Sequence, residues 1–251
     1  MTARSPADAV ALALPPPDRL ALFLDVDGTL VGTRPPDRPH QLDVDRLATL
    51  QALEDALGGA LAVISGRAVS ALDQFFHPLR LNAAGIQGIE TRIDRGHVER
   101  TELGPADTAV LDRLAHEVEA LGFPVEFEWK GAGLTFVYEE AAPFVEELMG
   151  LVEMRLTAGL RAYRGIIAID VVPSHAGKGP ALAKLMRQAP FAGRLPVHFG
   201  DDLADESAFE EAAGGGGFGV SVRRPTGLTR HHLADHEAVW QALTAYCRRH
   251  V

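Results

Sequence analysis

Short apolar runs alternate with amphipathic stretches over the first hundred residues. The near-continuous apolar run 20–26 predicts a strand that is covered on both faces. Apolar residues at helical spacing follow Asp43, a candidate N-cap, and Gly58-Gly59 marks the end of that helix. The remaining segments predict a strand at 60–64, a helix at 68–76, an extended segment at 81–84 and a hairpin at 88–100 that turns at 94–96.

The pattern changes near residue 105 and returns near residue 173. The middle region predicts a helix at 105–121, strands at 125–128 and 134–138, a helix at 143–156 and a strand at 166–172. Alternation then resumes with a helix after Lys178, a strand at 196–199, a helix from Ala204, a strand at 218–222 and a helix ending near Arg248. Such alternation is typical of a doubly wound, mostly parallel α/β sheet. We therefore expect an α/β core of residues 19–104 and 173–251, interrupted by a smaller α+β domain at 105–172.

Three short stretches lie outside this alternation. The apolar stretch 9–14 is too brief for a signal sequence and runs into three prolines, so residues 1–18 are expected to form a frayed leader. Gly214 to Gly217 precede a predicted strand and are expected to form a flexible turn. His231-His232 is expected to be a solvated helix end, because no further metal ligand is suggested nearby.

Composition narrows the class of partner. With 47% hydrophobic and 23% charged residues, the 251-residue chain can bury a large core. A formal net charge of −10 argues against a nucleic-acid or anionic-membrane partner, and no apolar run approaches membrane-spanning length. Cys247 is the only cysteine, so neither an internal disulfide nor a cysteine-based zinc site is expected, which suits a cytoplasmic protein.

The strongest chemical signal is the motif Asp25-Val26-Asp27-Gly28-Thr29 at the end of the first predicted strand. Ligands of doubly wound sheets bind outside the carboxyl ends of the strands. The spacing of two places both carboxylates on one side of the extended chain. One can attack phosphorus while the other protonates the departing oxygen and later activates water. A strand followed by an ordinary glycine turn would show the same residues without this chemistry.

Two further motifs offer groups that could hold a phosphate. Ser65-Gly66-Arg67 follows the second predicted strand and opens a helix, where a hydroxyl and a helix N-terminus favour an anion. Lys178 lies between two glycines ahead of a helix, from where an ammonium can reach a bound phosphate. Each has a plain structural explanation as well, because Ser65 could be an ordinary N-cap and Lys178 a solvated surface residue.

An acidic motif follows the strand predicted at 196–199. It runs from Gly200 through Asp201, Asp202, Leu203, Ala204 and Asp205 to Glu206. Acids at the end of a strand suit ligation of magnesium by oxygen, although an acid-rich helix N-terminus would look similar.

Taken in order, the acid pair, hydroxyl, lysine and acid cluster resemble the haloacid-dehalogenase (HAD) superfamily, over residues 20–245. The resemblance implies a Mg²⁺-dependent phosphatase whose HAD-like core carries a cap domain at 105–172, between Ser65 and Lys178. It implies that Asp25 is the nucleophile and Asp27 the general acid and base, while Ser65 and Lys178 hold the phosphate. The implied metal ligands are Asp25, the Asp27 carbonyl and Asp201, supported by Asp202 or Asp205.

Within that superfamily, the chain resembles the trehalose-6-phosphate phosphatase family. The similar stretches are 59–67, 84–90, 128–131 and 200–207. The implied reaction, the last step of trehalose biosynthesis, converts trehalose 6-phosphate into trehalose and inorganic phosphate. The implied substrate-binding residues are Asp25, Val26, Asp27, Gly66, Arg67, Gln87, Glu128, Lys130 and Asp170.

Departures from the family pattern fall mostly on the sugar side. Gln87 stands where the family usually has His, and Val137-Tyr138-Glu139 stands in place of His-Tyr-Arg. Asp170 replaces Glu, Val172 replaces a basic residue and Ala204 replaces Thr. The small-molecule partner is therefore expected to be trehalose 6-phosphate, with another sugar phosphate such as sucrose 6-phosphate left open. A phosphomutase and a non-catalytic sugar-phosphate sensor are also compatible with these motifs, and we expect a monomer.

Overall fold

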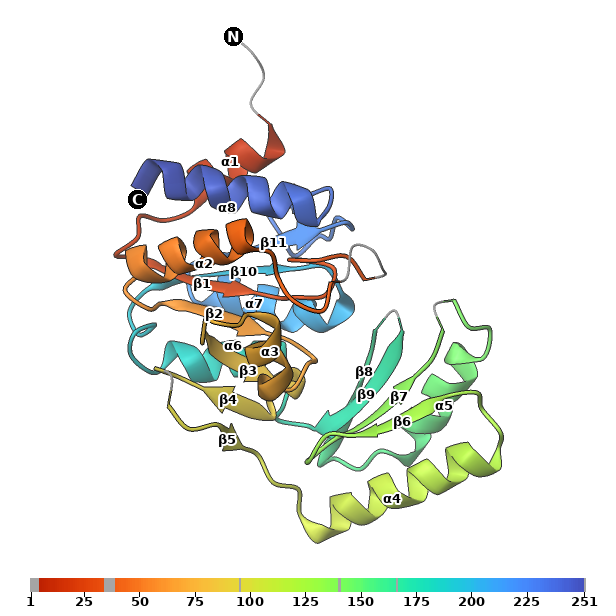
Figure 1. Ribbon diagram of the computed structural model, residues 1–251. Coiled ribbons are helices and arrows are strands. Elements are labelled where there is room, and N and C mark those ends of the chain that lie inside the picture. The colour runs from red at the N-terminus through yellow and green to blue at the C-terminus, as the bar shows by residue number, and fades with distance from the viewer. Residues whose placement is uncertain (1–4, 34–38, 95, 140, 166, 251) are drawn as a thin grey trace.

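The computed structural model describes residues 5–33, 39–94, 96–139, 141–165 and 167–250. It contains two sheets (Figure 1), which divide the chain into a large unit and a small unit. The small unit runs from α4 to β9 and lies beside the large unit, to which it is joined by two chain segments. Within the described residues, no helix combines the length and the apolar character needed to cross a bilayer.

An eight-stranded sheet forms the centre of the large unit, in the order β12-β11-β10-β1-β2-β3-β4-β5. The strands from β12 to β3 are parallel, and β4 and β5 continue the sheet antiparallel. Their bounds are β1 Leu20–Leu24, β2 Leu61–Ile64, β3 Asn82–Gly85, β4 Glu90–Arg92, β5 Glu99–Arg100, β10 Leu195–Gly200, β11 Phe218–Val222 and β12 His231–Leu233. Every residue of β1 and β2 is buried, as expected for central parallel strands. The doubly wound, mostly parallel core is confirmed.

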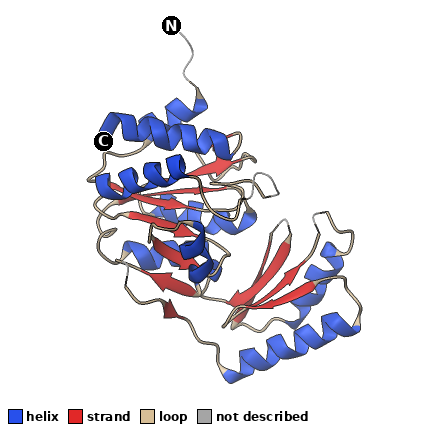
Figure 2. Ribbon diagram, in the orientation of Figure 1, coloured by secondary structure: helices blue, strands red, loops and turns tan. Residues whose placement is uncertain are grey.

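Helices cover the sheet on both sides, as Figure 2 shows. Their bounds are α1 Pro6–Ala13, α2 Val44–Ala56, α3 Val69–Phe75, α6 Lys178–Met186, α7 Glu206–Gly214 and α8 His236–His250, with short 3₁₀ helices η1 Ile86–Gly88 and η2 Leu203–Asp205. Helices α2 and α3 lie on one face of the sheet and α6 and α7 on the other (Figure 1), as right-handed crossovers would place them. Helix α8 packs on α1 and α2, and α6 packs on α7.

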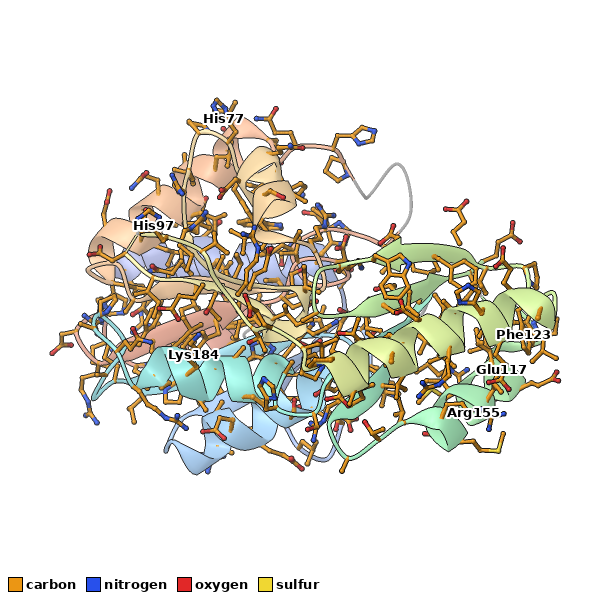
Figure 3. The ribbon with its side chains drawn as sticks, turned by 90° about the horizontal axis from the view of Figure 1, so that it is seen from below. His77, His97, Glu117, Phe123, Arg155 and Lys184 are labelled. Carbon is orange, nitrogen blue, oxygen red and sulfur yellow. The ribbon has the colours of Figure 1, made fainter. Side chains whose placement is uncertain are left out.

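The small unit is a four-stranded antiparallel sheet in the order β6-β7-β9-β8, with two helices on the side away from the large unit (Figure 1). Its elements are α4 Pro105–Ala120, β6 Glu126–Trp129, β7 Leu134–Val137, α5 Val145–Arg155, β8 Leu160–Arg164 and β9 Ala168–Pro173. It has its own hydrophobic cluster, which includes Leu114, Phe136 and Leu148. On the outer surface, Arg155 of α5 donates a hydrogen bond of 2.7 Å to Glu117 of α4 (Figure 3). Two helices packed on one face leave the other face of the sheet free to point at the large unit.

Two expectations from the sequence are wrong, and one strand was not expected. The segment expected as a frayed leader contains helix α1, whose Val10 and Ala11 are buried against α8. His231 and His232 lie in strand β12 and not at a helix end. The strand expected at 166–172 is present as β9, but the sequence did not predict β8, which pairs antiparallel with it. Two expected positions, Arg95 in the hairpin turn and Ile166 at the start of that strand, lie outside the described residues.

Candidate active site

Asp25 lies immediately after β1, at the carboxyl end of the central strands. Its backbone N–H donates to the carbonyl of Phe199 on β10 at 2.9 Å, which continues the ladder to the end of the strand. Gly28 turns the chain with φ +92°, and a Cβ there would lie 2.1 Å from Oδ2 of Asp201. A glycine is therefore required at this position, both for the turn and for the close approach of the loop that carries Asp201.

Lys178 begins helix α6 and reaches Asp25 from the other side. Its Nζ lies 2.8 Å from Oδ1 of Asp25 and 2.8 Å from Oδ1 of Asp205, and only 4% of the side chain is exposed. Burial opposes the charge on this ammonium, but the attraction of Asp205 and Asp25 outweighs burial and raises the pKa of Lys178. The lysine is therefore a fixed cation beside the acid expected to be the nucleophile.

Asp25, Asp201 and Asp205 bring one carboxylate oxygen each within 4.8 Å of one another. Burial, followed by repulsion from Asp205, raises the pKa of Asp201 to about 7. Burial also raises the pKa of Asp25, against the opposing effect of Lys178. Thr29 lies between two of these acids, with Oγ1 3.4 Å from Oδ2 of Asp25 and 3.4 Å from Oδ1 of Asp201. Crowded, desolvated carboxylates fit a hard divalent cation, because its charge removes the repulsion that raises these pKa values.

Asp205 differs from the other two acids in its hydrogen bonds. Its Oδ1 accepts from Lys178 Nζ at 2.8 Å and pairs with His198 Nε2 at 2.7 Å. Its Oδ2 accepts from the backbone N–H groups of Asp201 at 3.2 Å and Asp202 at 3.1 Å. An ionised carboxylate offers about four lone-pair sites, and these four contacts use them. Asp205 thus lies close enough to belong to the acid cluster of Asp25, Asp201 and Asp205. Its hydrogen bonds, however, hold Lys178 and the backbone of Asp201 and Asp202 in place.

Asp202 was expected to be the other possible metal support. Its side chain accepts a hydrogen bond from the backbone N–H of Leu203 and caps η2, in a capping box with Asp205. It is not part of the three-acid cluster found among the described residues. The structure therefore brings Asp25, Asp201 and Asp205 together and leaves Asp202 as a helix cap beside them.

Asp27 forms a bidentate ion pair with Arg67. The Nε and Nη2 atoms of Arg67 lie 2.7 and 2.6 Å from the two carboxylate oxygens, and the guanidinium stacks 4.6 Å from the centre of the Phe75 ring. The buried Ser65 accepts a 3.2 Å hydrogen bond from the backbone N–H of Arg67. Val26, in contrast, has its side chain in the hydrophobic core, so only its backbone can face a ligand.

A second polar group lies between the two units, centred on Asp170 of β9. Its Oδ1 accepts from Thr135 at 2.6 Å and lies 3.7 Å from Nζ of Lys130, while its Oδ2 accepts from Nε2 of Gln87 at 3.1 Å. Lys130 also pairs with Glu128 at 3.2 Å. The Gln87 amide lies over Gly66, where a Cβ would be 3.1 Å from Nε2. The other residues that were expected to bind the substrate thus meet in one connected group, which consists of Gly66, Gln87, Glu128, Lys130 and Asp170.

Oε1 of Gln87 is buried and has no hydrogen-bond partner among the described residues. Buried polar atoms are normally paired, so this acceptor is open to a donor such as a ligand hydroxyl. The residues at the other departures are placed differently, since Val172 and Ala204 are buried and Glu139 is exposed.

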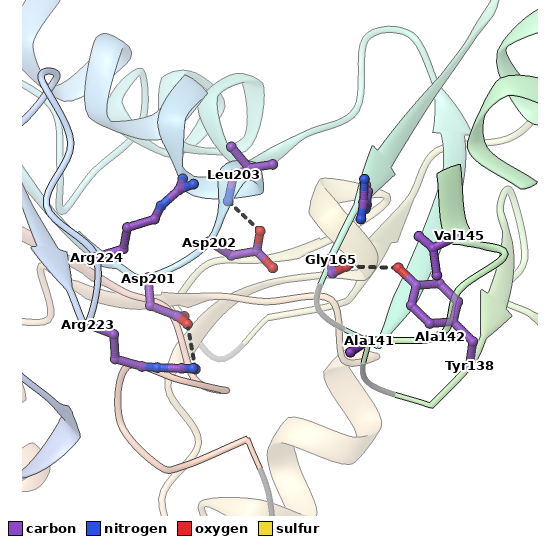
Figure 4. Close-up of a pocket in the computed structure, with 11 residues that line it drawn as sticks. Tyr138, Ala141, Ala142, Val145, Gly165, Asp201, Asp202, Leu203, Arg223 and Arg224 are labelled. Carbon is purple, nitrogen blue, oxygen red and sulfur yellow. Dashed lines mark hydrogen bonds and ion pairs between the residues drawn. The ribbon is translucent and has the colours of Figure 1, made fainter. Parts of the chain in front are cut away.

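A cavity of about 490 Å³ opens where the loop after β10, which carries Asp201 and Asp202, faces the β8–β9 hairpin (Figure 4). Asp201, Asp202, Leu203, Arg223 and Arg224 line it from the large unit, and Tyr138, Ala141, Ala142, Val145, Arg164 and Gly165 line it from the small unit. In Figure 4, Arg223 points at Asp201, and their closest atoms are 3.4 Å apart. The cavity therefore adjoins the acid cluster and carries three guanidinium groups.

The sequence alone did not point to several residues of this region. Thr29 belongs to the opening acid motif but was given no role, and Thr135, His198, Arg164 and Arg223 were not singled out. Thr29 could have been found from the sequence, because a hydroxyl four residues after Asp25 can reach back to the Asp25 carboxylate. In the structure its Oγ1 lies 3.4 Å from Oδ2 of Asp25. The others reach the site only through pairing of distant strands, which no local motif reveals.

Comparison with known proteins bears on the family of this chain. A family model described as trehalose-phosphatase matches residues 23–237. Trehalose-6-phosphate phosphatase of Escherichia coli is 36% identical over 231 residues, which cover 90% of this chain and 85% of the relative.

Solved structures share the fold. The C-terminal domain of a trehalose-6-phosphate phosphatase from C. albicans superposes with a TM-score of 0.78 at 19% identity, covering 96% of this chain and 97% of that domain. A phosphatase of the haloalkanoate (HAD) enzyme superfamily from Bacteroides thetaiotaomicron gives a TM-score of 0.62 at 19% identity, covering 91% of this chain and 94% of its own. At such identity the likeness concerns the fold alone, which is that of HAD phosphatases. The match to the family model over most of the chain goes further, and the protein belongs to the trehalose-phosphatase family as a phosphoric monoester hydrolase.

Proposed function

We propose that the chain hydrolyses trehalose 6-phosphate to trehalose and inorganic phosphate, with Asp25 as nucleophile. The observation that carries this proposal is the buried contact of Lys178 with Asp25 at 2.8 Å, beside the acid cluster at the carboxyl end of β1. A fixed ammonium next to a desolvated carboxylate provides both an attacking oxygen and a cation for the phosphate. The choice of substrate follows from membership of the family and from the names of the relatives.

In the first step, an oxygen of Asp25 attacks phosphorus and the bond from phosphorus to the sugar oxygen breaks. Lys178 and the Ser65 hydroxyl hold the phosphate oxygens, and Asp27 gives its proton to the departing sugar oxygen. Trehalose leaves, and the phosphoryl group remains on Asp25 as an acyl phosphate.

In the second step, Asp27 is ionised and draws a proton from water, whose oxygen attacks the same phosphorus. The bond between phosphorus and Asp25 breaks, inorganic phosphate departs and the carboxylate of Asp25 is restored. Asp27 ends the cycle protonated, and it gives this proton to solvent when the ion pair with Arg67 forms again. The proton balance closes, because Asp27 loses one proton in the first step and recovers one in the second.

Arg67 must release Asp27 for this cycle to run, because the bidentate ion pair occupies both oxygens of the acid. A phosphate ester arriving in the cleft offers Arg67 a second bidentate anion. Once Arg67 has moved to the phosphate, Asp27 takes up a proton from solvent, which it then gives to the sugar oxygen. The Arg67–Asp27 pair is thus assigned to the enzyme before substrate binds.

Asp25 and Asp201 would hold the metal, assigned to Mg²⁺, together with the backbone carbonyl of Asp27. When bound, such an ion supplies charge for the phosphate oxygens and positions them for in-line attack. Asp205 is assigned a supporting role, since its lone pairs are already used by Lys178, His198 and two backbone N–H groups. Asp202 is assigned the helix cap.

The small unit is proposed to act as a cap that selects the sugar. Asp170, Gln87, Lys130 and Glu128 form the polar group that faces the sugar, and Oε1 of Gln87 is open to a hydroxyl. An aspartate and an amide can together accept and donate to a polyhydroxyl ligand. This group carries the choice of disaccharide.

The test is phosphate release in the presence of Mg²⁺ from trehalose 6-phosphate, sucrose 6-phosphate and glucose 6-phosphate, compared as kcat/KM. We expect trehalose 6-phosphate to be preferred, with release abolished by EDTA and by Asp25→Asn. A preference for another sugar phosphate would reject the substrate and keep the chemistry. Undiminished release by Asp25→Asn would reject the mechanism.

A further inference from the structure

His198 lies behind the active site, in the middle of strand β10, and it is completely buried. It pairs with Phe23 of β1 on one side and Gly219 of β11 on the other, so it belongs to the centre of the sheet. An apolar side chain would be expected at such a position. The strand instead carries an imidazole, whose ring lies 5.6 Å from the ring of Phe209 on α7.

The two ring nitrogens of His198 differ in their surroundings. Nε2 lies 2.7 Å from Oδ1 of Asp205, whereas the buried Nδ1 has no hydrogen-bond partner among the described residues. Burial lowers the pKa of His198 in spite of the opposing effect of Asp205, which favours the neutral ring. Because an ionised Asp205 can only accept, the proton of that neutral ring is on Nε2.

The strand is also shaped to receive Asp205. Gly200 lies two residues after His198, on the same face of β10, and a Cβ there would lie 2.2 Å from Cγ of Asp205. Any side chain at this position would displace the carboxylate. The Asp205 carboxylate therefore occupies the space that a side chain at position 200 would fill, beside the buried imidazole of His198.

We propose that His198 is a positioning residue for the phosphatase reaction: its Nε2–H fixes the Asp205 carboxylate, which in turn holds Lys178 and the Asp201 loop. The remaining contacts of Asp205 support this chain of action. One oxygen shares Lys178 with Asp25, and the other holds the backbone N–H groups of Asp201 and Asp202. Without the imidazole, the carboxylate can rotate toward Lys178 and draw the ammonium away from Asp25, while the loop bearing Asp201 loosens.

This inference rests on the proposed function, because it assigns Asp201 to the metal and Lys178 to the phosphate. Mutation of the outer-shell partners of a metal ligand typically costs about 10- to 100-fold in metal affinity or activity. His198 acts on the Asp201 loop through such a partner, Asp205. Simple loss of packing would instead lower thermal stability and leave metal affinity unchanged. The two roles can therefore be separated.

The test uses three variants of the full chain. His198→Phe keeps an aromatic ring but has no donor, His198→Gln places an amide N–H near the position of Nε2, and Phe209→Leu removes packing against the same ring without touching a hydrogen bond. Mg²⁺ affinity is measured by calorimetry, and kcat and KM for trehalose 6-phosphate are measured in parallel. We expect His198→Phe to weaken Mg²⁺ binding by about 10- to 100-fold and to lower kcat more than it raises KM. His198→Gln should restore most of both, and Phe209→Leu should lower Tm alone.

Equal Mg²⁺ affinity and kcat in His198→Phe and the wild type would overturn the inference, as would equal losses in the Phe and Gln variants. If His198→Phe does not fold, His198→Asn replaces it, because its amide lies near the position of Nδ1. Weak Mg²⁺ binding by Asn with near-normal binding by Gln would then support the inference, and equal binding would overturn it.

The proposed function is judged separately. A wild-type chain that binds Mg²⁺ but releases no phosphate from trehalose 6-phosphate rejects that function and leaves the His198 comparison intact. A wild-type chain without measurable Mg²⁺ affinity overturns the inference and leaves phosphate release to decide the function.

Discussion

The acid cluster of the large unit, formed by Asp25, Asp201 and Asp205, and the polar group around Asp170 are built differently. In the acid cluster, Lys178 and Asp205 are almost fully buried, and the contacts of Lys178 with Asp205 and with Asp25 both measure 2.8 Å. Around Asp170, the closest nitrogen contacts are 3.1 Å to Gln87 and 3.7 Å to Lys130, and 53% of the Glu128 side chain is exposed.

The difference shows where each part of the reaction is determined. The carboxylates and the ammonium proposed to carry out phosphoryl transfer are held by buried contacts, so little reorganisation would remain for the reaction. The residues proposed to meet the sugar lie at the boundary of two units, where Oε1 of Gln87 has no partner among the described residues. Under the proposed function, the chemistry depends on the interior of one unit, and sugar recognition depends on the contact between the two units.

The largest effect is expected from Asp25→Asn, which removes the attacking oxygen. We expect kcat to fall by about 10³-fold or more, because the effect of losing a nucleophile is of this size or larger. Tm in EDTA should be retained or raised, since the substitution removes a buried charge whose pKa is elevated by burial. Phosphate release and thermal unfolding are measured on the same sample, and a low Tm would assign the loss to unfolding.

Lys178→Met should be nearly as severe, but it should act on stability as well. The substitution leaves Asp25 and Asp205 without their shared cation. Breaking a buried ion pair from one side costs about 3 to 5 kcal/mol of unfolding free energy. Urea unfolding in EDTA checks this value, and Lys184→Met on the same helix is the control, because that side chain is 40% exposed. Equal unfolding free energies of the two variants would contradict the proposed contribution of the Lys178 ion pairs to stability.

The stability of the metal-free protein should fall as pH rises from about 4 to 7. Burial, then Asp205, raises the pKa of Asp201 from 3.8 to about 7, so the folded state binds a proton that the unfolded state has released. The contribution is at most about 1.4 kcal/mol per pH unit. Asp201→Asn should flatten this slope, as should saturating Mg²⁺ in the wild type. Urea midpoints at pH 5 and 7 measure the slope, and an unchanged slope in Asp201→Asn contradicts the assignment to this carboxyl.

A smaller effect, confined to substrate use, is expected from Asp170→Asn. Loss of the carboxylate weakens the contacts with Thr135 and Lys130, which should raise KM for trehalose 6-phosphate by about 10-fold, the value of one or two hydrogen bonds. The value of kcat should change little. Glu139→Gln, an exposed change in the same unit, is the control. A fall in kcat without a change in KM would break the separation between recognition and chemistry.

The smallest effect is expected away from both regions, at the contact of α8 with the segment after α1. Tyr246 donates a 2.7 Å hydrogen bond to the carbonyl of Pro15, and Tyr246→Phe should lower stability by about 1 kcal/mol with unchanged kcat/KM. Urea unfolding and phosphate release together check this result. Altered turnover would show that the N-terminal helix communicates with the cleft.

The parts of the fold that could be predicted from sequence are those with a local signal. The apolar run of β1 and the acids that follow it form one continuous motif, and Lys178 lies at a glycine-flanked helix start. The large parallel sheet and the inserted small sheet follow from alternation of apolar runs along the chain. Each of these features depends on neighbours that are close in the sequence.

The missed parts depend on distant partners. Strand β8 carries Arg161, Tyr163 and Arg164, so its amphiphilic pattern has little apolar signal until it pairs with β9. Helix α1 has a short apolar stripe that becomes a buried face only against α8. His198 is a lone histidine in an apolar strand, and only the fold shows that it faces an acid seven residues later.

Strand β9 and helix α6 are separated by four residues, since β9 ends at Pro173 and α6 begins at Lys178. This short connection is tied to both units: Tyr163 of the small unit donates to the carbonyl of Ala176 at 3.0 Å, and the N–H of Gly177 donates to the carbonyl of Gln87 at 2.6 Å. A tilt of the small sheet is therefore expected to move the backbone at the start of α6, where Lys178 lies. If the small unit selects the sugar as proposed, we expect a substrate that tilts the small sheet differently to shift Lys178 relative to Asp25.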